Sequence, residues 1–314
     1  MSLKRRHILT AVLAAPLALP TIRQARAANT LRMGFQKGEP ILVALKAAQT
    51  LETQLAPLGW DVTWVEFQFG PPMMEAMRAD SIDIGAVGDT PPIFAQAARG
   101  NLVYIAGQRA GAQGVLLPAG SKIQTIQDLK GKKFAFGRGS SAHSLALKVL
   151  EKAHLTYDQI EPIYLSPADA SAAFEKGAID AWSIWDPYFA LFENRPGVRT
   201  LITDSDVGGQ NSFFMARTGF TKDNPDITTK TVDAFIQTAA WARHHRKDMA
   251  DLLARSTGMD RTAVGKAVDR SPFEVNFMDD AYTQAQQDVA NRFRALNLIP
   301  TDIQVSSIVW HPPA

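Results

Sequence analysis

The chain has no cysteine among its 314 residues. This absence excludes disulfide bonds, thiolate metal sites, a cysteine nucleophile and a lipid-modified cysteine anchor. A membrane-spanning stretch of roughly 20 apolar residues is also missing, because the first apolar run extends only from Ile8 to about Leu19. The six histidines show no H-E-x-x-H spacing. We therefore expect neither a metal site nor a cofactor.

The first 27 residues have the features of an export signal. Lys4-Arg5-Arg6 precedes the apolar run, and Ala25-Arg26-Ala27 offers a cleavage site. We expect cleavage near Ala27 and a periplasmic mature protein, with an uncleaved anchor as the alternative. Arg5-Arg6-His7-Ile8-Leu9 resembles a twin-arginine signal, but Lys4 stands where such signals usually have Ser or Thr. Both export routes therefore stay open.

The balance of charge excludes polyanionic partners. The whole chain carries a formal charge of +2, but residues 1–27 contain five basic and no acidic residues. Their removal leaves 28 basic against 31 acidic residues, a formal charge of −3. A mildly acidic protein does not favour nucleic acid or an anionic membrane surface.

Strand-like and helix-like stretches alternate in two sets, which predicts parallel sheets in two lobes. A long helical segment follows from about residue 218. The predicted strands are 30–35, 61–67, 82–87, 133–136, 162–165 and 178–184, and the predicted helices are 41–56, 72–79, 92–99, 141–153, 168–176, a helix from Pro187, 226–247, 261–270 and 279–296.

An internal repeat indicates that the two lobes are similar. "IDIGAVGD" (82–89) aligns with "IDAWSIWD" (179–186) at an offset of 97 residues. Gly85 and Gly88 of the first copy correspond to Trp182 and Trp185 of the second. Because ligands lie beyond the carboxyl ends of parallel strands, the copies predict a backbone-rich and an aromatic side of one cleft. Coincidence between two βα units, and buried packing of the tryptophans, are the alternatives.

The segment "GRGSSAHS" (137–144) follows a predicted strand and opens a helix. It fits the dinucleotide form G-x-G-x-x-A, but the next strand ends in Leu165-Ser166-Pro167, without the acidic residue of that fingerprint. The free N–H groups of a helix start, with the Ser140 and Ser141 hydroxyls, form a seat for an anion. His143 is either a further donor or an ordinary helix residue.

Asp89 and Asp186 each precede proline at a predicted helix start, where the plain role of the carboxylate is to cap the helix. Gln36 and Lys37 lie in the first strand-to-helix turn and are candidates to face the same cleft, although solvent exposure is the default for a loop lysine.

Four segments together resemble the aliphatic sulfonate-binding proteins of ABC importers, which are similar to the taurine- and nitrate-binding proteins. They are "GFQKGEPILVALK", "GDTPPIFAQAA", "DLKGKKFAFGRGSSAH" and "AIDAWSIWDPY". The resemblance covers about residues 30–220 and continues more weakly beyond.

The resemblance implies an α/β, two-lobed periplasmic binding protein (type II) with two crossover strands, 113–118 and 211–217, and a helical C-terminal segment. Lobe I then comprises 28–114 and 215–314, and lobe II comprises 115–214. The expected function is reception of an alkanesulfonate and delivery to an inner-membrane permease with its ATPase, without catalysis. The expected ligand-binding residues are Gln36, Lys37, Gly88, Asp89, Thr90, Ser140, Ser141, His143, Trp182, Trp185, Asp186 and Asn211.

Other readings stay open. The same fold is compatible with taurine, nitrate or a pyrimidine as ligand, although nitrate requires no apolar wall. A pyrimidine-synthesising enzyme of this fold is a further alternative, against which the export signal and the absence of cysteine argue.

Overall fold

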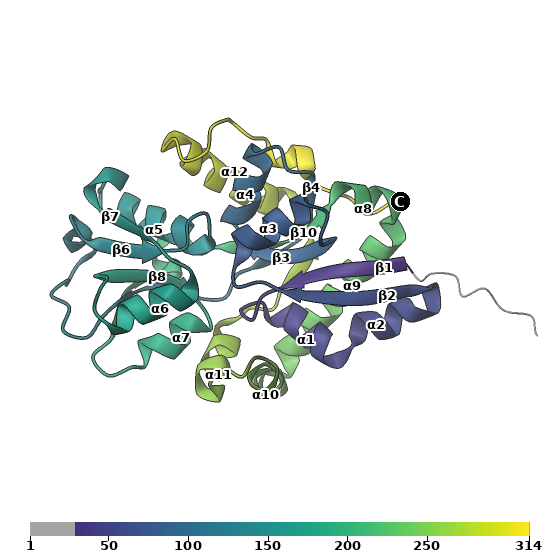
Figure 1. The fold of residues 1–314 in the computed structure, drawn as a ribbon, viewed down its shortest axis with the longest axis horizontal. Helices are drawn as coiled ribbons and strands as arrows, with labels where there is room; N and C mark the ends of the chain where they lie inside the picture. The colour runs from purple at the N-terminus through teal and green to yellow at the C-terminus, as the bar shows by residue number, and fades with distance from the viewer. Residues whose placement is uncertain (1–28, 314) are drawn as a thin grey trace, which may run out of the picture.

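The structure is a computed structural model that describes residues 29–313, and its strands form two sheets, one in each lobe (Figure 1). The predicted signal peptide lies outside the described residues. The first sheet contains, in spatial order, β11 (Val275–Phe277), β4 (Leu102–Arg109), β10 (Asn211–Arg217), β3 (Ile84–Gly88), β1 (Asn29–Phe35) and β2 (Trp60–Glu66). The second contains β7 (Glu161–Tyr164), β6 (Lys133–Phe136), β8 (Ala181–Trp185), β5 (Gln113–Leu117) and β9 (Arg199–Thr203).

Helices cover both faces of each sheet, because the central strands β3, β4, β5, β8 and β10 are buried on both sides. On the first sheet, α1 (Pro40–Ala48), α9 (Pro225–His244) and α10 (Arg246–Thr257) pack on one face, and α3 (Gly70–Arg78), α4 (Thr90–Ala97) and α12 (Asp280–Ala295) on the other. On the second sheet, α5 (Ser141–Lys152) lies opposite α6 (Pro167–Glu175) and α7 (Tyr188–Glu193). The remaining helices are α2 (Thr50–Leu55), α8 (Thr218–Asp223) and α11 (Arg261–Arg270). No helix within residues 29–313 has the length and apolar character needed to cross a membrane.

The two sheets share one topology. In the first, the parallel strands β2, β1 and β3 are followed by antiparallel β10. In the second, parallel β7, β6 and β8 are followed by antiparallel β5. The predicted repeat and the predicted two-lobed α/β fold are therefore confirmed.

The chain passes between the lobes twice, through short links. One link joins β4 to β5 at residues 110–112, and the other joins η4 (Asp204–Val207) to β10 at residues 208–210. The segments 113–118 and 211–217, predicted as crossover strands, instead correspond to β5 and β10, and each strand lies within a single sheet. Backbone hydrogen bonds along each of these strands hold it within its sheet. The chain therefore crosses between the lobes in the two links and not in these strands. The exact lobe boundaries given above stay a prediction.

Two predicted helices are shorter than expected. The helix predicted over 41–56 divides into α1 and α2 at Gln49, whose φ of 51° ends α1 in the left-handed conformation. The helix predicted over 226–247 ends at His244, and α10 begins directly after it. Strands β4, β9 and β11 were not predicted.

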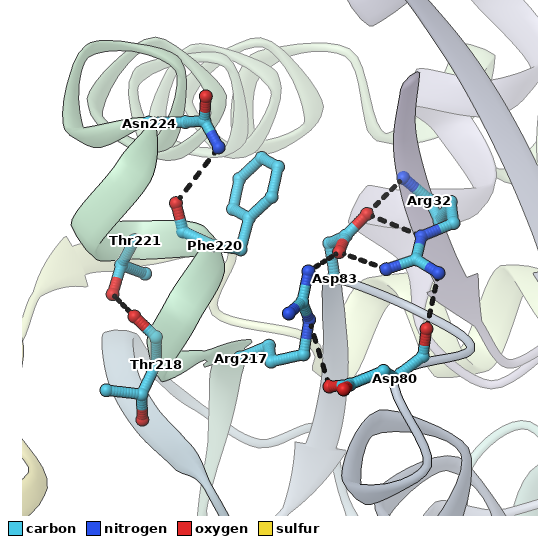
Figure 2. A network of polar contacts seen from close by, with 8 residues as sticks. All are labelled: Arg32, Asp80, Asp83, Arg217, Thr218, Phe220, Thr221 and Asn224. Atoms are coloured by element: carbon cyan, nitrogen blue, oxygen red, sulfur yellow. Dashed lines mark hydrogen bonds and ion pairs between the residues drawn. The ribbon is translucent and has the colours of Figure 1, made fainter. Parts of the chain in front are cut away.

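A buried carboxylate anchors the first sheet at the end that lies away from the second lobe. Asp83 precedes β3, and only 2% of its side chain is exposed. Its carboxylate accepts hydrogen bonds from the backbone and side chain of Arg32 on β1, at 2.6–3.0 Å, and from Arg217 on β10 at 2.8 Å (Figure 2). Arg217 also pairs with Asp80. One carboxylate thus joins three adjacent strands.

Asp180 occupies the equivalent place in the second lobe. It accepts a hydrogen bond from the Lys133 amide, and its own amide donates to the Lys133 carbonyl, as Asp83 does with Arg32. Asp180 has no arginine partners in the described part of the chain. The repeated Ile-Asp pair therefore has a structural role, because its aspartate fixes the start of β3 in the first sheet and of β8 in the second.

We predict that Asp83→Asn lowers the free energy of unfolding by about 3 kcal/mol, because it removes the buried counter-charge of Arg32 and leaves Arg217 only its pair with the exposed Asp80. The matched variant Asp180→Asn is expected to cost about 1 kcal/mol, the scale of a single hydrogen bond. Urea denaturation at pH 7 measures both. Equal losses in the two variants would contradict an ion-pair role for Asp83.

Acidification tests the same network. Desolvation acts to raise the pKa of Asp83, but the hydrogen bonds from Arg32 and Arg217 outweigh it and hold that pKa below its usual value. The resulting stabilisation is present above about pH 4 and is lost as the pH falls through the folded pKa.

Candidate functional site

A cavity lies between the lobes, at the carboxyl ends of the parallel strands of both sheets, where open α/β sheets bind ligands. The first lobe contributes the turn after β1 and the end of β3. The second lobe contributes the start of α5 and the end of β8. Both faces therefore present backbone groups and loop side chains to the same enclosed space.

Seven of the predicted site residues line this cavity. They are Gln36, Lys37, Gly88, Ser140, Ser141, Trp185 and Asp186. The amide of Gln36 donates to the Ala86 carbonyl at 2.8 Å, so Gln36 also ties the first turn to β3. Lys37 lies 3.7 Å from Glu66 and is half-exposed.

The start of α5 provides the hydrogen-bond donors. A turn precedes it, closed by the Ser140 amide and hydroxyl, which both donate to the Gly137 carbonyl, at 3.1 and 2.7 Å. Gly139 adopts a φ of 69° in this turn, a conformation that favours glycine. The first amides of α5 have no partner within the helix, and Ser141 faces the cavity beside them. This end of the helix suits an anion.

Two reciprocal contacts bring the lobes together around the cavity. At the end of β3, a Cβ on Gly88 would lie 2.6 Å from the Ser141 Cβ, so this contact requires glycine. At the end of β8, Trp185 lies against Gly38, where an added Cβ would be 3.2 Å from the indole Nε1. Each lobe thus places a strand end against the first helix start of the other.

Helices α10 and α11 and the residues after them form an apolar wall that sequence reasoning missed. The wall consists of Leu253, Met259, Val264, Val268 and Phe273. All but Met259 are buried. These residues lie far along the chain from the motifs identified in the sequence. Their helical spacing is also typical of ordinary core packing. Only the folding of the C-terminal segment back onto the cleft brings them to the site.

Two buried carboxyl groups also line the cavity. Glu39 caps α1 by accepting from the Ile41 amide and also accepts from Gln108 at 3.0 Å. Asp186 accepts from the Ala190 amide in the first turn of α7 at 3.0 Å, although Pro187 and not Asp186 occupies the N-cap position. Burial raises the pKa of each group to about 7.

The other five predicted residues lie elsewhere. Trp182 is 1% exposed and packs edge-to-face on Phe192 in the core, because the strand alternation turns it away from the cleft. Thr90 is buried and donates to Asp89. Asp89 and Asn211 line a second, polar cavity behind the links. His143 is 1% exposed and lies among aromatic rings.

The predicted capping role of Asp89 is wrong. Its side chain makes no cap hydrogen bond to α4; it accepts instead from Thr90 and from Gln210 of the second link. The backbone of Asp89 is itself helical, with φ −62° and ψ −34°, and this directs the carboxylate toward the link rather than along the helix axis. Gln210 also donates to the Ser141 carbonyl, so it joins the two lobes.

An ion-pair cluster closes one flank of the cavity. Arg270 of α11 contacts Glu193 of α7, lies 3.6 Å from Asp186, and stacks over Phe189 at 5.0 Å. Lys266 pairs with Glu193 at 2.8 Å. Beneath them, Ala190 packs against alanines of α11. Asp186 belongs both to this cluster and to the lining of the cavity. The contacts that hold α7 against α11 therefore include a residue of the site.

We predict that the ligand-free protein becomes less stable as the pH rises from about 5 to 8. Unfolded carboxyl groups titrate near pH 4, whereas Glu39 and Asp186 titrate near 7 when folded. The folded state keeps these protons where the unfolded state has lost them, so stability falls across that interval. Glu39→Gln is expected to reduce the slope by up to about 1.4 kcal/mol per pH unit, as measured by urea denaturation. An unchanged slope would contradict the shift.

We predict that Arg270→Gln speeds release of a molecule bound in the cavity about tenfold, since it opens the α7–α11 flank. Stopped-flow fluorescence of Trp185 measures the rate. Arg292→Gln is the matched control, because Arg292 pairs with the exposed Glu151 on the opposite flank at 2.8 Å. Equal acceleration by both variants would show that the Arg270 cluster has no special place in closure.

Known proteins match the chain in sequence and in structure. The profile of the "NMT1/THI5 like" family matches residues 73–249. The chain is 36% identical, over 98% of its length and 97% of the relative's, to a protein of Escherichia coli K12 named as an aliphatic sulfonates-binding protein. The taurine-binding periplasmic protein of the same organism is 27% identical over 69% of this chain and 66% of its own.

Solved structures agree. The periplasmic aliphatic sulphonate binding protein SsuA of E. coli superposes with a TM-score of 0.81 at 36% identity, covering 91% of this chain and 93% of the other. The alkanesulfonate-binding protein SsuA of Xanthomonas axonopodis pv. citri, bound to MOPS, gives 0.86 at 35% identity, covering 91% and 99%. A desulfurization enzyme, DszB, shares the fold alone, with a TM-score of 0.65 at 16% identity over 90% and 96%. The chain belongs to the NMT1/THI5 like family, together with these sulfonate-binding proteins.

Proposed function

We propose that the protein is an extracytoplasmic receptor of an ABC importer, which binds aliphatic sulfonates between its lobes and delivers them to a membrane permease with its ATPase. One observation carries the proposal: a donor-rich helix start and an apolar wall line the same inter-lobe cavity. The relatives, which are binding proteins for sulfonates by name, support it.

The start of α5 matches the head group. A sulfonate stays ionised at neutral pH and carries three acceptor oxygens and no donor. The first-turn amides of α5 and the Ser141 hydroxyl offer donors to these oxygens, and the helix dipole favours negative charge.

The apolar wall matches an alkyl chain. Trp185 and the side chains from α10 and α11 offer an apolar surface that an aliphatic tail of several carbons covers. Removing apolar surface from water contributes a favourable free energy of about 25 cal/mol per Å². Nitrate has no apolar part that could pack against this wall.

The carboxyl groups of the cavity argue against a ligand that needs a free anionic partner. Taurine carries an ammonium group, but both oxygens of Glu39 already accept, from the Ile41 amide and Gln108. The Asp186 carboxylate lies beside the Arg270 guanidinium, which would repel an ammonium group, and within residues 29–313 only its Oδ2 lacks a hydrogen-bond partner. We therefore place unsubstituted alkanesulfonates ahead of taurine.

Reception without catalysis is part of the proposal. The site residues bind and enclose, and the chain has no cysteine for nucleophilic chemistry. Export through cleavage near Ala27 puts the receptor in the periplasm, where its permease is accessible.

We predict that thermal stability and calorimetric affinity rise with alkyl length across a panel of alkanesulfonates, and that taurine, nitrate, sulfate and a pyrimidine give smaller responses. A ligand at ~100 times its dissociation constant adds about 2.7 kcal/mol to stability. Recovery of the ligand unchanged separates a receptor from an enzyme. A shift with nitrate or the pyrimidine, and none with any sulfonate, would overturn the choice of ligand.

Two variants divide the site into its parts. Ser141→Ala should weaken all alkanesulfonates by a similar factor, about tenfold, the scale of a hydrogen bond to a charged group. Trp185→Ala should weaken long chains more than short ones. Trp241→Ala is the matched control, because Trp241 is 38% exposed and stacks on His245, outside the cavity lining.

A further inference from the structure

His143 sits directly behind the anion seat without lining the cavity. It occupies the first turn of α5, two residues after Ser141, and is 1% exposed. Its ring stacks on Phe136 of the same lobe at 4.8 Å and meets the edge of Phe293 of the other lobe at 5.1 Å. The imidazole is therefore held between the two lobes.

Both ring nitrogens have partners, and the partners determine the tautomer. Nδ1 accepts a hydrogen bond from the Gly139 amide at 3.3 Å, so Nδ1 carries no proton. A neutral imidazole has one N–H, which must then be on Nε2. Nε2 lies 3.1 Å from the Tyr157 hydroxyl, to which it donates.

The chain of hydrogen bonds continues to the surface of the second lobe. The Tyr157 and Tyr164 hydroxyls share a hydrogen bond at 2.8 Å, in which either oxygen can donate, and Tyr164 is 43% exposed. Arg138 lies over the Tyr164 ring at 5.5 Å and is the charged group that faces His143.

The first bond of the chain acts on the turn that forms the anion seat. Gly139 has a φ of 69°, and the turn it belongs to is closed by Ser140 on Gly137. The His143 side chain adds a third bond that fixes the same turn from inside. A shift of the Gly139 peptide would move the first amides of α5, which are the donors of the site.

We infer that His143, as its neutral Nε2–H tautomer, is a positioning residue: it holds the Gly137–Ser140 turn so that the start of α5 presents its donors to the anion. His143 itself does not contact the ligand, contrary to its prediction as a ligand-binding residue. Desolvation, followed by the charge of Arg138, lowers the pKa of His143 to about 3, which keeps the acceptor nitrogen available at physiological pH. This inference deepens the proposed function and rests on it only for the identity of the anion.

The tautomer is measurable without a ligand. In protein labelled with ¹⁵N-histidine, long-range proton–nitrogen spectra should show one imidazole with a non-protonated Nδ1 and a protonated Nε2, unchanged between pH 8 and pH 5. The spectrum of His143→Phe identifies its signals among the six histidines. The opposite tautomer, or titration near pH 6.5, would overturn the inference.

Binding variants test the positioning role. His143→Phe keeps the stacked ring and removes both hydrogen bonds, and should weaken the anion that the wild type binds about tenfold, equivalent to about 1.4 kcal/mol. His143→Asn places an oxygen near the Nδ1 position and should recover most of the affinity. His154→Asn is the matched control, because His154 is exposed and its φ of 56° suits asparagine.

The outcomes of these experiments distinguish a positioning role of His143 from a packing role. Equal losses in His143→Phe and His143→Asn would assign the effect to packing and overturn the role of the Gly139 bond, as would an unchanged affinity in His143→Phe. If His143→Phe fails to fold, the spectrum of His143→Asn identifies the His143 signals instead, and the tautomer of the wild-type protein then decides the matter. Because that measurement involves no ligand, its failure is distinct from a failure of the sulfonate proposal.

Discussion

The contact between Gly88 and Ser141 is the constraint on which the site depends. It brings the end of β3 in one lobe against the first residue of α5 in the other, closer than any side chain at position 88 would allow. The cavity is enclosed because this contact and its counterpart between Trp185 and Gly38 hold its two sides. The two lobes share a topology, so equivalent strand ends meet equivalent helix starts. The Gly88–Ser141 contact lies beside the donors of α5, whereas Trp185 forms the other contact, against Gly38.

The surrounding structure supports this juxtaposition from three directions. Gln210, in the second link, bonds to Asp89 of one lobe and to the Ser141 carbonyl of the other. The cluster around Arg270 closes the flank formed by α7 and α11. Phe293 of α12 meets His143 of α5, and Figure 1 shows these two helices on the side opposite α7 and α11. Inside the cavity both oxygens of Glu39 are paired, and of the Asp186 carboxylate only Oδ2 lacks a partner within residues 29–313. The cavity thus offers donors at the start of α5 for an anionic head group and an apolar surface for its body.

The motifs of the sequence predicted the fold and about half of the site, and the limits have physical causes. Strand ends and helix starts are marked by local sequence patterns, as at Asp186-Pro187 and Ser140-Ser141, and these four residues line the cavity. Strand alternation, however, turns Trp182 into the core, and a helix turn carries His143 behind the seat. No local sequence pattern marks the apolar wall of α10 and α11. Its residues have the spacing of ordinary core residues and differ from them only because they border the cavity. Strand β4 escaped prediction because it is buried on both faces and does not alternate.

The most direct test of the whole account is a crystal structure with a medium-chain alkanesulfonate, in which anomalous scattering locates the sulfonate sulfur. The account predicts that this sulfur lies at the first turn of α5, within hydrogen-bonding distance of the Ser141 hydroxyl. The alkyl chain should run past Trp185 toward Met259 and Val268. A sulfonate bound at the α10–α11 wall, with its chain pointing to α5, or a ligand outside the inter-lobe cavity, would contradict it.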